Sequence, residues 1–230
     1  MRALEKNNKG FSILELIVVL TIIGIISAVA YPNISHWNKA RQIENSAIQI
    51  KTLFTNINSQ VQRGNYGFVQ IYINSTDTKV DVISKGMKTS TLAQKINGDD
   101  NFQSISERCN TDDNDYWDDD GNIDRKPEVI KIELDKIATT FTGVGAVCFS
   151  KDGQWYSASK NLINGNAPIT SIYICEKELV SCVKRNDDDK LVIDDEVEYL
   201  YAVSWSRFGN IKLEKYNLND DVWILSLIHI

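Results

Sequence analysis

Residues 9–20 read Lys9-Gly10-Phe11-Ser12-Ile13-Leu14-Glu15-Leu16-Ile17-Val18-Val19-Leu20, and the apolar run that they begin continues to Ala30. The twenty residues 11–30 comprise fifteen apolar side chains, one glycine and four polar residues. A helix of this length is about 30 Å long, enough to cross the hydrocarbon core of a bilayer. The preceding residues 1–10 carry three basic side chains and one acidic one, and a basic flank stays in the cytoplasm. The sequence therefore predicts a transmembrane helix over residues 11–31, with the rest of the chain outside.

Glu15 is the one charged side chain in this apolar run. A charged group inside a membrane helix costs about 2.5–3.5 kcal/mol on insertion scales, so it marks a functional position. If the chain were cut after Gly10, Phe11 would carry a free α-amine four residues before Glu15. In a bundle of such helices, the carboxylate of one chain could neutralise the α-amine of its neighbour. The sequence therefore predicts that Glu15 is an assembly contact.

The Gly10-Phe11 junction, Glu15, the apolar run and Pro32 together resemble the class III signal peptide of type IV pilins and the related pseudopilins. The resemblance implies that a prepilin peptidase cuts between Gly10 and Phe11 and methylates the new amine. An uncleaved signal anchor is the alternative interpretation. A cleaved secretory signal fits less well, because no A-x-A-like site closes the apolar run.

The same resemblance implies a location and a set of partners. The chain would cross the bacterial inner membrane once, with its N-terminus cytoplasmic and its head periplasmic, and then enter a pilus or a type II secretion pseudopilus. Its partners would be membrane lipid before assembly, other pilin or pseudopilin subunits, the prepilin peptidase and an inner-membrane assembly platform.

A second apolar pattern follows Pro32. It has a 3-4 spacing, with Trp37 three residues ahead of it, and comprises Ala40, Ile43, Ala47, Ile50, Phe54, Ile57 and Val61. This is the stripe of an amphipathic helix over residues 32–64, which Gly64 ends. Packing on the chain's own sheet is the favoured use of the stripe, and a coiled-coil partner is the alternative. Pro32 lacks a backbone N–H and is predicted to kink the helix near the membrane surface.

From residue 66 the apolar period becomes two, which is typical of strands. Strands are predicted over residues 66–73, 79–83, 128–134, 145–149, 154–158, 168–175, 198–205 and 210–216, with a short helix over 87–96. The fold class is therefore α+β and pilin-like: a long N-terminal α-helix, half transmembrane and half amphipathic, packs on an antiparallel β-sheet head. The head covers residues 65–224 and contains an acidic insertion, 97–126. The apolar residues 225–230 are treated as a doubtful tail.

Three stretches of the head, residues 145–153, 169–175 and 201–211, resemble the domain shared by the minor pseudopilin GspH and the minor pilins FimT and FimU. In that family a hairpin with an aspartate-glycine turn precedes a strand, and a strand pair closes around a glycine near the end. The resemblance covers residues 32–216, with the insertion 97–126 unmatched. It implies a minor pilin or minor pseudopilin.

Four cysteines on the outer side of the membrane indicate disulfides, because that compartment is oxidising. Cys175 and Cys182 bracket six residues, which suits a bridge across a turn. Cys109 and Cys148 would then pair and tether the acidic insertion to the sheet. Four cysteines allow three pairings, and one bridge with two buried thiols also stays open. Neither pair has C-x-x-C spacing, which argues against a redox site or a zinc ribbon.

The acidic insertion offers carboxylates for calcium, with Asp118, Asp120 and Asp124 as candidate ligands around Gly121. The EF-hand register fails, because with Gly121 in sixth place the first and twelfth positions hold a tyrosine and a proline. A looser calcium loop and a solvated acidic loop are the two interpretations. No other cofactor is expected.

The formal net charge of −6 disfavours broad nucleic-acid binding without excluding a local basic patch. One such cluster lies near the Cys175–Cys182 loop and comprises Lys177, Lys184, Arg185 and Lys190. It supports the alternative function, a tip-located adhesin or DNA-uptake minor pilin. No hydrolase elbow, P-loop or dinucleotide fingerprint is present, and the two histidines are His36 and His229. The sequence therefore predicts a structural subunit and no enzyme.

Overall fold

The computed structural model describes residues 12–98, 108–109, 128–141, 143–151, 155–158, 170–177, 181–185, 191–194, 196–206 and 210–225. The chain divides into two compact units, Met1–Arg41 and Gln42–Ile230. The second unit, called the head below, contains every described strand and the C-terminal part of the long helix α1 (Ile13–Gln62).

The helix α1 ends where the sequence predicts. Gly64 has a positive φ of 79° and its N–H donates to the carbonyl of Val61 at 3.0 Å. The N–H of Asn65 donates to the carbonyl of Gln60 at 3.1 Å, so two of the last carbonyls of the helix are satisfied. Glycine is suited to this position because it has no Cβ to oppose the left-handed conformation.

The apolar stripe of α1 is buried in the head, as the favoured interpretation predicts. Ile43, Ala47, Ile50, Phe54, Ile57 and Val61 are all between 0 and 3 % exposed. Trp37 does not belong to this stripe, because its side chain is 58 % exposed and stacks under Arg41 at 5.1 Å. Two successive three-residue steps separate Trp37 from Ile43. At roughly 100° per residue these steps place Trp37 about 120° around the helix from Ile43, and therefore off the buried face.

The first sheet has the order β3-β2-β1-β5-β6, and all its described pairs are antiparallel. Its strands are β1 (Phe68–Ser75), β2 (Lys79–Met87), β3 (Glu128–Asp135), β5 (Val144–Ser150) and β6 (Trp155–Ala158). A short helix, α2 (Thr89–Gly98), follows β2. Residue Phe68 of β1 pairs with Ser150 of β5, far along the chain.

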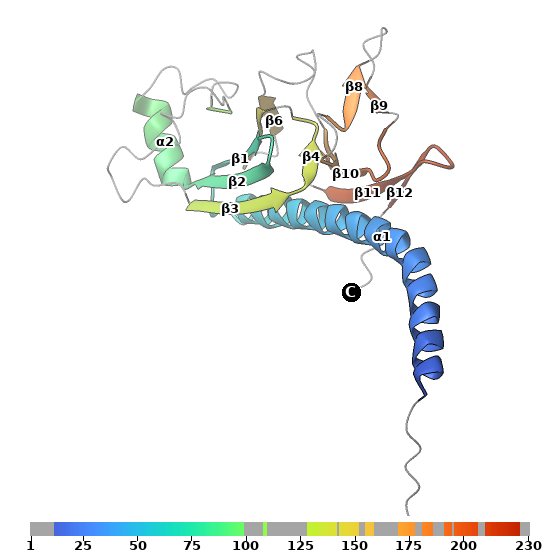
Figure 1. The fold of residues 1–230 in the computed structure, drawn as a ribbon. Coiled ribbons are helices and arrows are strands. Elements are labelled where there is room, and N and C mark those ends of the chain that lie inside the picture. Colours follow the sequence, from blue (N-terminus) through green and yellow to red (C-terminus); the bar gives the residue numbers. More distant parts are fainter. Residues whose placement is uncertain are drawn as a thin grey trace, which may run out of the picture. The chain divides into compact units, whose positions relative to one another are not determined.

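The second sheet has the order β12-β11-β10-β7-β4 and is also antiparallel. Its strands are β4 (Ile137–Thr139), β7 (Ser171–Glu176), β10 (Tyr201–Trp205), β11 (Ile211–Asn217) and β12 (Val222–Leu225). A separate hairpin joins β8 (Val183–Arg185) to β9 (Leu191–Ile193). In Figure 1 this hairpin stands above β10 and β11, on the side of the sheet away from α1.

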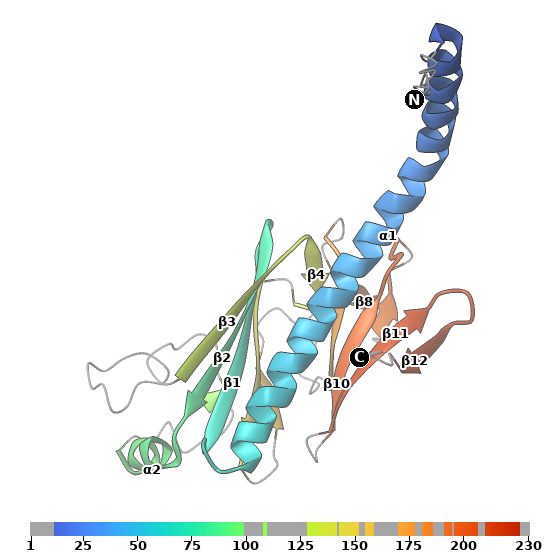
Figure 2. The same ribbon diagram turned by 90° about the horizontal axis from the view of Figure 1, so that it is seen from below.

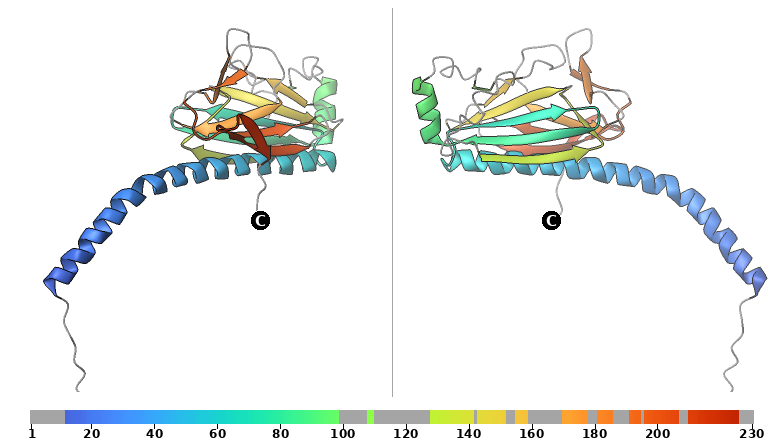
Figure 3. Two further views of the ribbon diagram at one scale, coloured as in Figure 1. Left: turned by 90° about the vertical axis from the view of Figure 1, so that its right-hand side faces the viewer. Right: turned by 60° about the vertical axis from the view of Figure 1, so that its left-hand side comes forward.

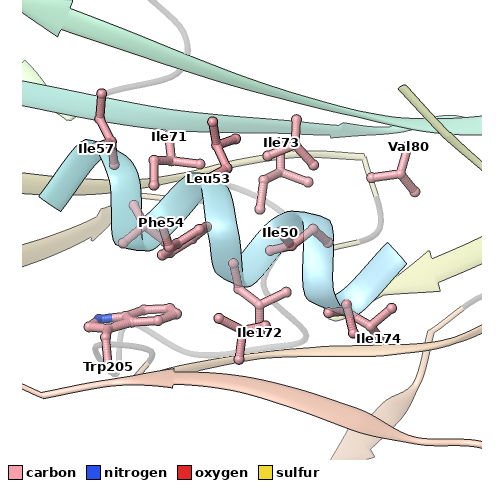
Figure 4. Close-up of a cluster of buried hydrophobic side chains, with 14 of the residues drawn as sticks. Ile50, Leu53, Phe54, Ile57, Ile71, Ile73, Val80, Ile172, Ile174 and Trp205 are labelled. Carbon is pink, nitrogen blue, oxygen red and sulfur yellow. The ribbon is translucent and has the colours of Figure 1, made fainter. Parts of the chain in front are cut away.

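The core lies between the head part of α1 and both sheets. Figure 2 shows this part of α1 running along the line where β1 to β3 face β10 and β11. In the close-up, Leu53 and Ile57 of α1 point toward Ile71 and Ile73 of the first sheet, and Phe54 lies nearer Trp205 of the second (Figure 4). These side chains form one cluster in which every member is buried. One helix face therefore covers the inner faces of both sheets.

The predicted strands all appear, with boundaries shifted by a few residues, and the short helix is observed as α2. The sequence missed β4, β8, β9 and β12, each of which has only three or four residues. Leu225, the first residue of the doubtful tail, belongs to β12 and pairs with Glu214. Lys136 lies between β3 and β4 with a φ of 57°, and there the chain passes from one sheet to the other.

Candidate functional site

The N-terminal turn of α1 is capped by Ser12. Its Oγ accepts a hydrogen bond from the N–H of Leu14 at 3.3 Å, and its carbonyl accepts one from the N–H of Leu16 at 3.2 Å. Glu15 lies in this first turn, three residues after the cap. The order Ser-x-x-Glu is that of a capping box, and an acidic residue here is favoured by the helix dipole. The sequence interpretation missed this local role, although Ser12 and Glu15 carry its signal.

The turns that follow are apolar and exposed on every side. The exposed fraction is 82 % at Ile13, 47 % at Val19 and 61 % at Ile26. A helix that is apolar all round normally lies in a protein core or a membrane. Among the described residues, no helix is long and apolar enough to cross a bilayer.

The structure tests two other predictions about this segment, the cleavage junction and the kink at Pro32, only in part. Gly10 and Phe11, the predicted cleavage junction, lie outside the described residues. The helix runs without a break across Pro32. The kink at Pro32 and the cleavage after Gly10 stay predictions.

The four cysteines form two disulfides, Cys109–Cys148 and Cys175–Cys182, which is the pairing that the sequence favoured. The first joins Cys109 to β5 and lies in a small apolar cluster with Phe68 and Met87, on the face of the first sheet turned away from α1. The second lies in a matching cluster on the equivalent face of the second sheet. No free cysteine is present. We call these two faces the outer faces.

The remaining predicted ligands and contacts are largely outside the described part of the chain. Asp118, Asp120 and Asp124 are among the residues that the structure does not describe, so calcium binding stays a prediction. Within the described ranges no group of three or more potential ligands could hold a metal ion. Of the basic cluster, Lys177 donates from Nζ to the carbonyl of Thr76, which ties it to the β1–β2 turn.

The outer face of the first sheet carries a network of four charged side chains. Lys79 contacts Asp81 at 3.3 Å and Glu133 at 3.0 Å, and Lys131 contacts the same two carboxylates at 3.5 and 2.6 Å. Hydrogen bonds from Lys131 and Lys79 lower the pKa of Glu133 to about 2, and the bond to Glu133 raises the pKa of each lysine. The two lysines and the two carboxylates therefore form one network of ion pairs.

The second sheet has a groove that the sequence did not predict. It has a volume of about 650 Å³ and lies between the β8–β9 hairpin and the β11–β12 pair. Tyr173, Tyr216 and Trp223 form its aromatic part, with the Trp223 ring 5.7 Å from that of Tyr173 and 5.0 Å from that of Tyr216. No sequence pattern points to this groove, because the three aromatic residues come from three different strands.

Comparison with known proteins identifies the N-terminal segment. The family model of the prokaryotic N-terminal methylation motif matches residues 6–31, which include the predicted cleavage junction and Glu15. The N-terminal segment of this chain therefore has the methylation motif. Two curated relatives, each named "Fimbrial protein" and from Pseudomonas aeruginosa, are 32 % identical to this chain over 89 residues.

The matched region covers 38 % of this chain and 53 % of each relative, so the chain spans about half the length of the curated relatives that it matches. No solved structure is significantly similar to it. The α+β arrangement of a long N-terminal helix and antiparallel sheets agrees with a pilin-like fold.

Proposed function

We propose that this pilin-like chain is a structural subunit that inserts in the bacterial inner membrane, is cut after Gly10 by a prepilin peptidase, and assembles into a pilus or a type II secretion pseudopilus. The observation that carries the proposal is the match to the methylation motif over residues 6–31. The helix that follows supports it, because Glu15 stands in its first turn and apolar side chains are exposed around it.

The exposed apolar side chains of α1 need an apolar environment. Before assembly the acyl chains of lipid would provide it, and after assembly the helices of neighbouring subunits would. Lipid tails are as apolar as leucine, so this exchange gains little from the hydrophobic effect, and close packing and polar contacts must drive it. Gly24, Ser27 and Ala28 would permit close approach, and apart from its chain neighbours and the adjacent helix backbone a Cβ added at Gly24 would meet no atom within 4 Å.

Glu15 would then act in two settings. In the single subunit its position after the Ser12 cap favours the negative charge through the dipole of its own helix. In the fibre the methylated α-amine of Phe11 from a neighbouring subunit would pair with it. Breaking such a pair leaves a charge in an apolar environment, which is strongly unfavourable, so the pair would fix the position of each added subunit.

Within the pilin-like proteins, we propose a minor pilin or pseudopilin of the GspH and FimT type. The support comes from the sequence resemblance and from the two antiparallel pairs that it covers, β5–β6 and β10–β11. The proposed partners are other pilin or pseudopilin subunits, the peptidase and the assembly platform. This role requires no catalysis.

Replacing Glu15 by leucine tests the assembly role. We expect Glu15→Leu to reach the membrane at the level of the unchanged chain but to be lost from sheared fibres by at least about tenfold, because the charge pair is gone. Thr21→Leu is the matched control, since it also makes this helix more apolar but removes no charge. Fibre incorporation of Glu15→Leu equal to that of Thr21→Leu would overturn the proposal.

Mass spectrometry of the N-terminus tests the processing step. The exported chain should begin with an N-methylated Phe11, and a Gly10→Leu variant should retain residues 1–10. An intact first methionine on the exported chain would contradict the proposal, whatever the behaviour of Glu15.

A further inference from the structure

The groove on the outer face of the second sheet has the composition of a site for an organic cation. Tyr216 and Trp223 are paired across β11 and β12, so their side chains lie on one face, and Tyr173 lies on β7 within ring contact of Trp223. Trp223 is 38 % exposed, so its ring is available at the mouth of the groove. Aromatic faces attract a cation through the ring quadrupole, most strongly in tryptophan.

Two of the residues that line the groove are acidic. Asp194 and Asp221 line the groove, and no described lining residue is basic. Glu214 lies on the same face, where it accepts a hydrogen bond from Ser204 at 3.0 Å. Burial first, and then the charge of Glu214, raise the pKa of Tyr173. The carboxylates of the lining therefore favour a positive group over a neutral or negative one.

The strand beside the groove can accept a further strand. Among the described residues, β12 is at the end of its sheet and pairs only with β11, which leaves its other edge without a strand partner. In Figure 3 the dark-red β12 lies at the outside of the head, in front of the other strands in the left view. All four side chains of β12 are exposed, by 38–51 %. An edge strand with exposed apolar side chains is a template for strand addition.

We propose that the groove and the β12 edge bind an extended, basic segment of a neighbouring subunit, which adds a strand to β12 and places a lysine or arginine side chain against Trp223, Tyr216 and Asp221. The proposal names a contact of the assembly proposed above and rests on it for the identity of the partner. Alternate side chains of an added strand face the same way. Basic side chains at every second position would therefore face the groove, and apolar ones would lie beside Val222 and Ile224.

The other occupants fit the charges less well. A neutral sugar could stack on Trp223 but would gain nothing from the charge of Asp221 and Asp194. An acidic peptide or a nucleic acid would be repelled by the same carboxylates. The test below includes a neutral oligosaccharide and an acidic peptide as competitors.

The test measures binding of a labelled Val-Lys-Val-Lys-Val peptide to the full chain in detergent micelles, by fluorescence anisotropy. The same peptide with acetylated lysines keeps the shape and removes the charge. We expect the acetylated peptide to bind at least about fivefold more weakly, which corresponds to one cation–π contact. Equal binding of the two peptides, or displacement of the lysine peptide by a neutral oligosaccharide or an acidic peptide, would overturn the proposal.

Two variants locate the site. Asp221 has a φ of 56°, a conformation that asparagine also tolerates, so Asp221→Asn removes the charge without straining the turn. We expect Asp221→Asn and Trp223→Ala each to weaken lysine-peptide binding by at least about fivefold. The matched controls are Glu133→Gln, on the other sheet, and Trp37→Ala, outside the head, and neither should change it. If Asp221→Asn binds the lysine peptide with unchanged affinity, the proposal is wrong, even if Trp223→Ala fails to fold.

This result is independent of fibre assembly. The Glu15→Leu chain should bind the lysine peptide as well as the unchanged chain does, because its head is intact. A chain that enters fibres normally but does not bind the lysine peptide would therefore count against the groove proposal alone. A chain that binds the lysine peptide normally but does not enter fibres would concern the role of Glu15 alone.

Discussion

The two sheets of the head resemble each other on their inner faces and differ on their outer faces. Each inner face presents buried apolar residues to the same stripe of α1. The outer face of the first sheet carries a network of ion pairs among Lys79, Asp81, Lys131 and Glu133. The outer face of the second sheet instead has an aromatic groove with carboxylates around it. The comparison teaches that a shared core can support one outer face with a network of ion pairs and another with an aromatic groove.

The largest expected effect on stability comes from replacing Phe54, whose ring lies beside aromatic rings of both sheets. Its ring lies 6.0 Å from Phe149 of the first sheet and 5.4 Å from Trp205 of the second. Phe54→Ala should lower the free energy of unfolding of the head by about 3–5 kcal/mol, because it leaves a cavity at the centre of the core. Urea unfolding followed by tryptophan fluorescence measures this change.

The matched control is Leu20→Ala, in the exposed apolar part of the same helix, where the leucine is 58 % exposed. It should leave the unfolding of the head unchanged. A loss below about 1 kcal/mol in Phe54→Ala would show that the two sheets do not share one core.

The two disulfides should differ in their effect on stability. Their cysteines are 39 and 7 residues apart. By the loop-entropy model, replacing both Cys109 and Cys148 by alanine should cost about 4 kcal/mol, and replacing Cys175 and Cys182 about 2.5 kcal/mol. Alanine is used because all four cysteines are fully buried and serine would bury an extra hydroxyl. Thermal and urea unfolding of the two double variants, each compared with the unchanged chain, would show the order. A reversed order would mean that native packing, and not loop length, dominates.

A buried carboxylate of the second sheet should give a smaller loss. Glu176 is 8 % exposed and accepts hydrogen bonds from the N–H groups of Glu198 at 2.6 Å and Tyr199 at 3.3 Å. Glu176→Ala should lower the unfolding free energy by about 1–3 kcal/mol, since both donors lose a charged acceptor. Hydrogen exchange of these two amides should also become faster. The control is Glu196→Ala, at an exposed residue of the loop that contains Glu198 and Tyr199. It should change neither the unfolding free energy nor the exchange rate of the two amides.

The smallest effect concerns the charge network of the first sheet and depends on pH. Because the folded-state pKa of Glu133 is lowered from 4.5 to about 2, its carboxylate stabilises the fold above pH 4.5. That contribution is lost as the pH falls from about 4.5 to about 2. The stability difference between the unchanged chain and Glu133→Gln should therefore shrink over this window, and added salt should reduce it. A difference that is constant from pH 6 to about pH 2 would contradict the network.

Several elements were predictable because their signals are local. The stripe from Ile43 to Val61 predicts both the helix and its buried face, and Gly64 predicts its end. Trp37, three residues ahead of the stripe, lies off the buried face, since a 3-3 step drifts around the helix more than a 3-4 step does. The disulfide between Cys175 and Cys182 was favoured because their spacing suits a turn.

The short strands and the groove could not be predicted in this way. A strand of three or four residues, such as β4 or β12, has too few positions to show a period. The groove depends on Tyr173, Tyr216 and Trp223 meeting across three strands, and no local pattern encodes such a meeting.

By itself, the sequence determined the N-terminal methylation motif, the position of Glu15 and the amphipathic half of α1, because each is written in neighbouring residues or in one helical period. Only the tertiary structure decided how the strands divide between two sheets and which outer face carries the groove. The physical reason is that sheet pairing joins residues distant in sequence, as Phe68 joins Ser150, and the energy of each pair depends on the packing of all the others.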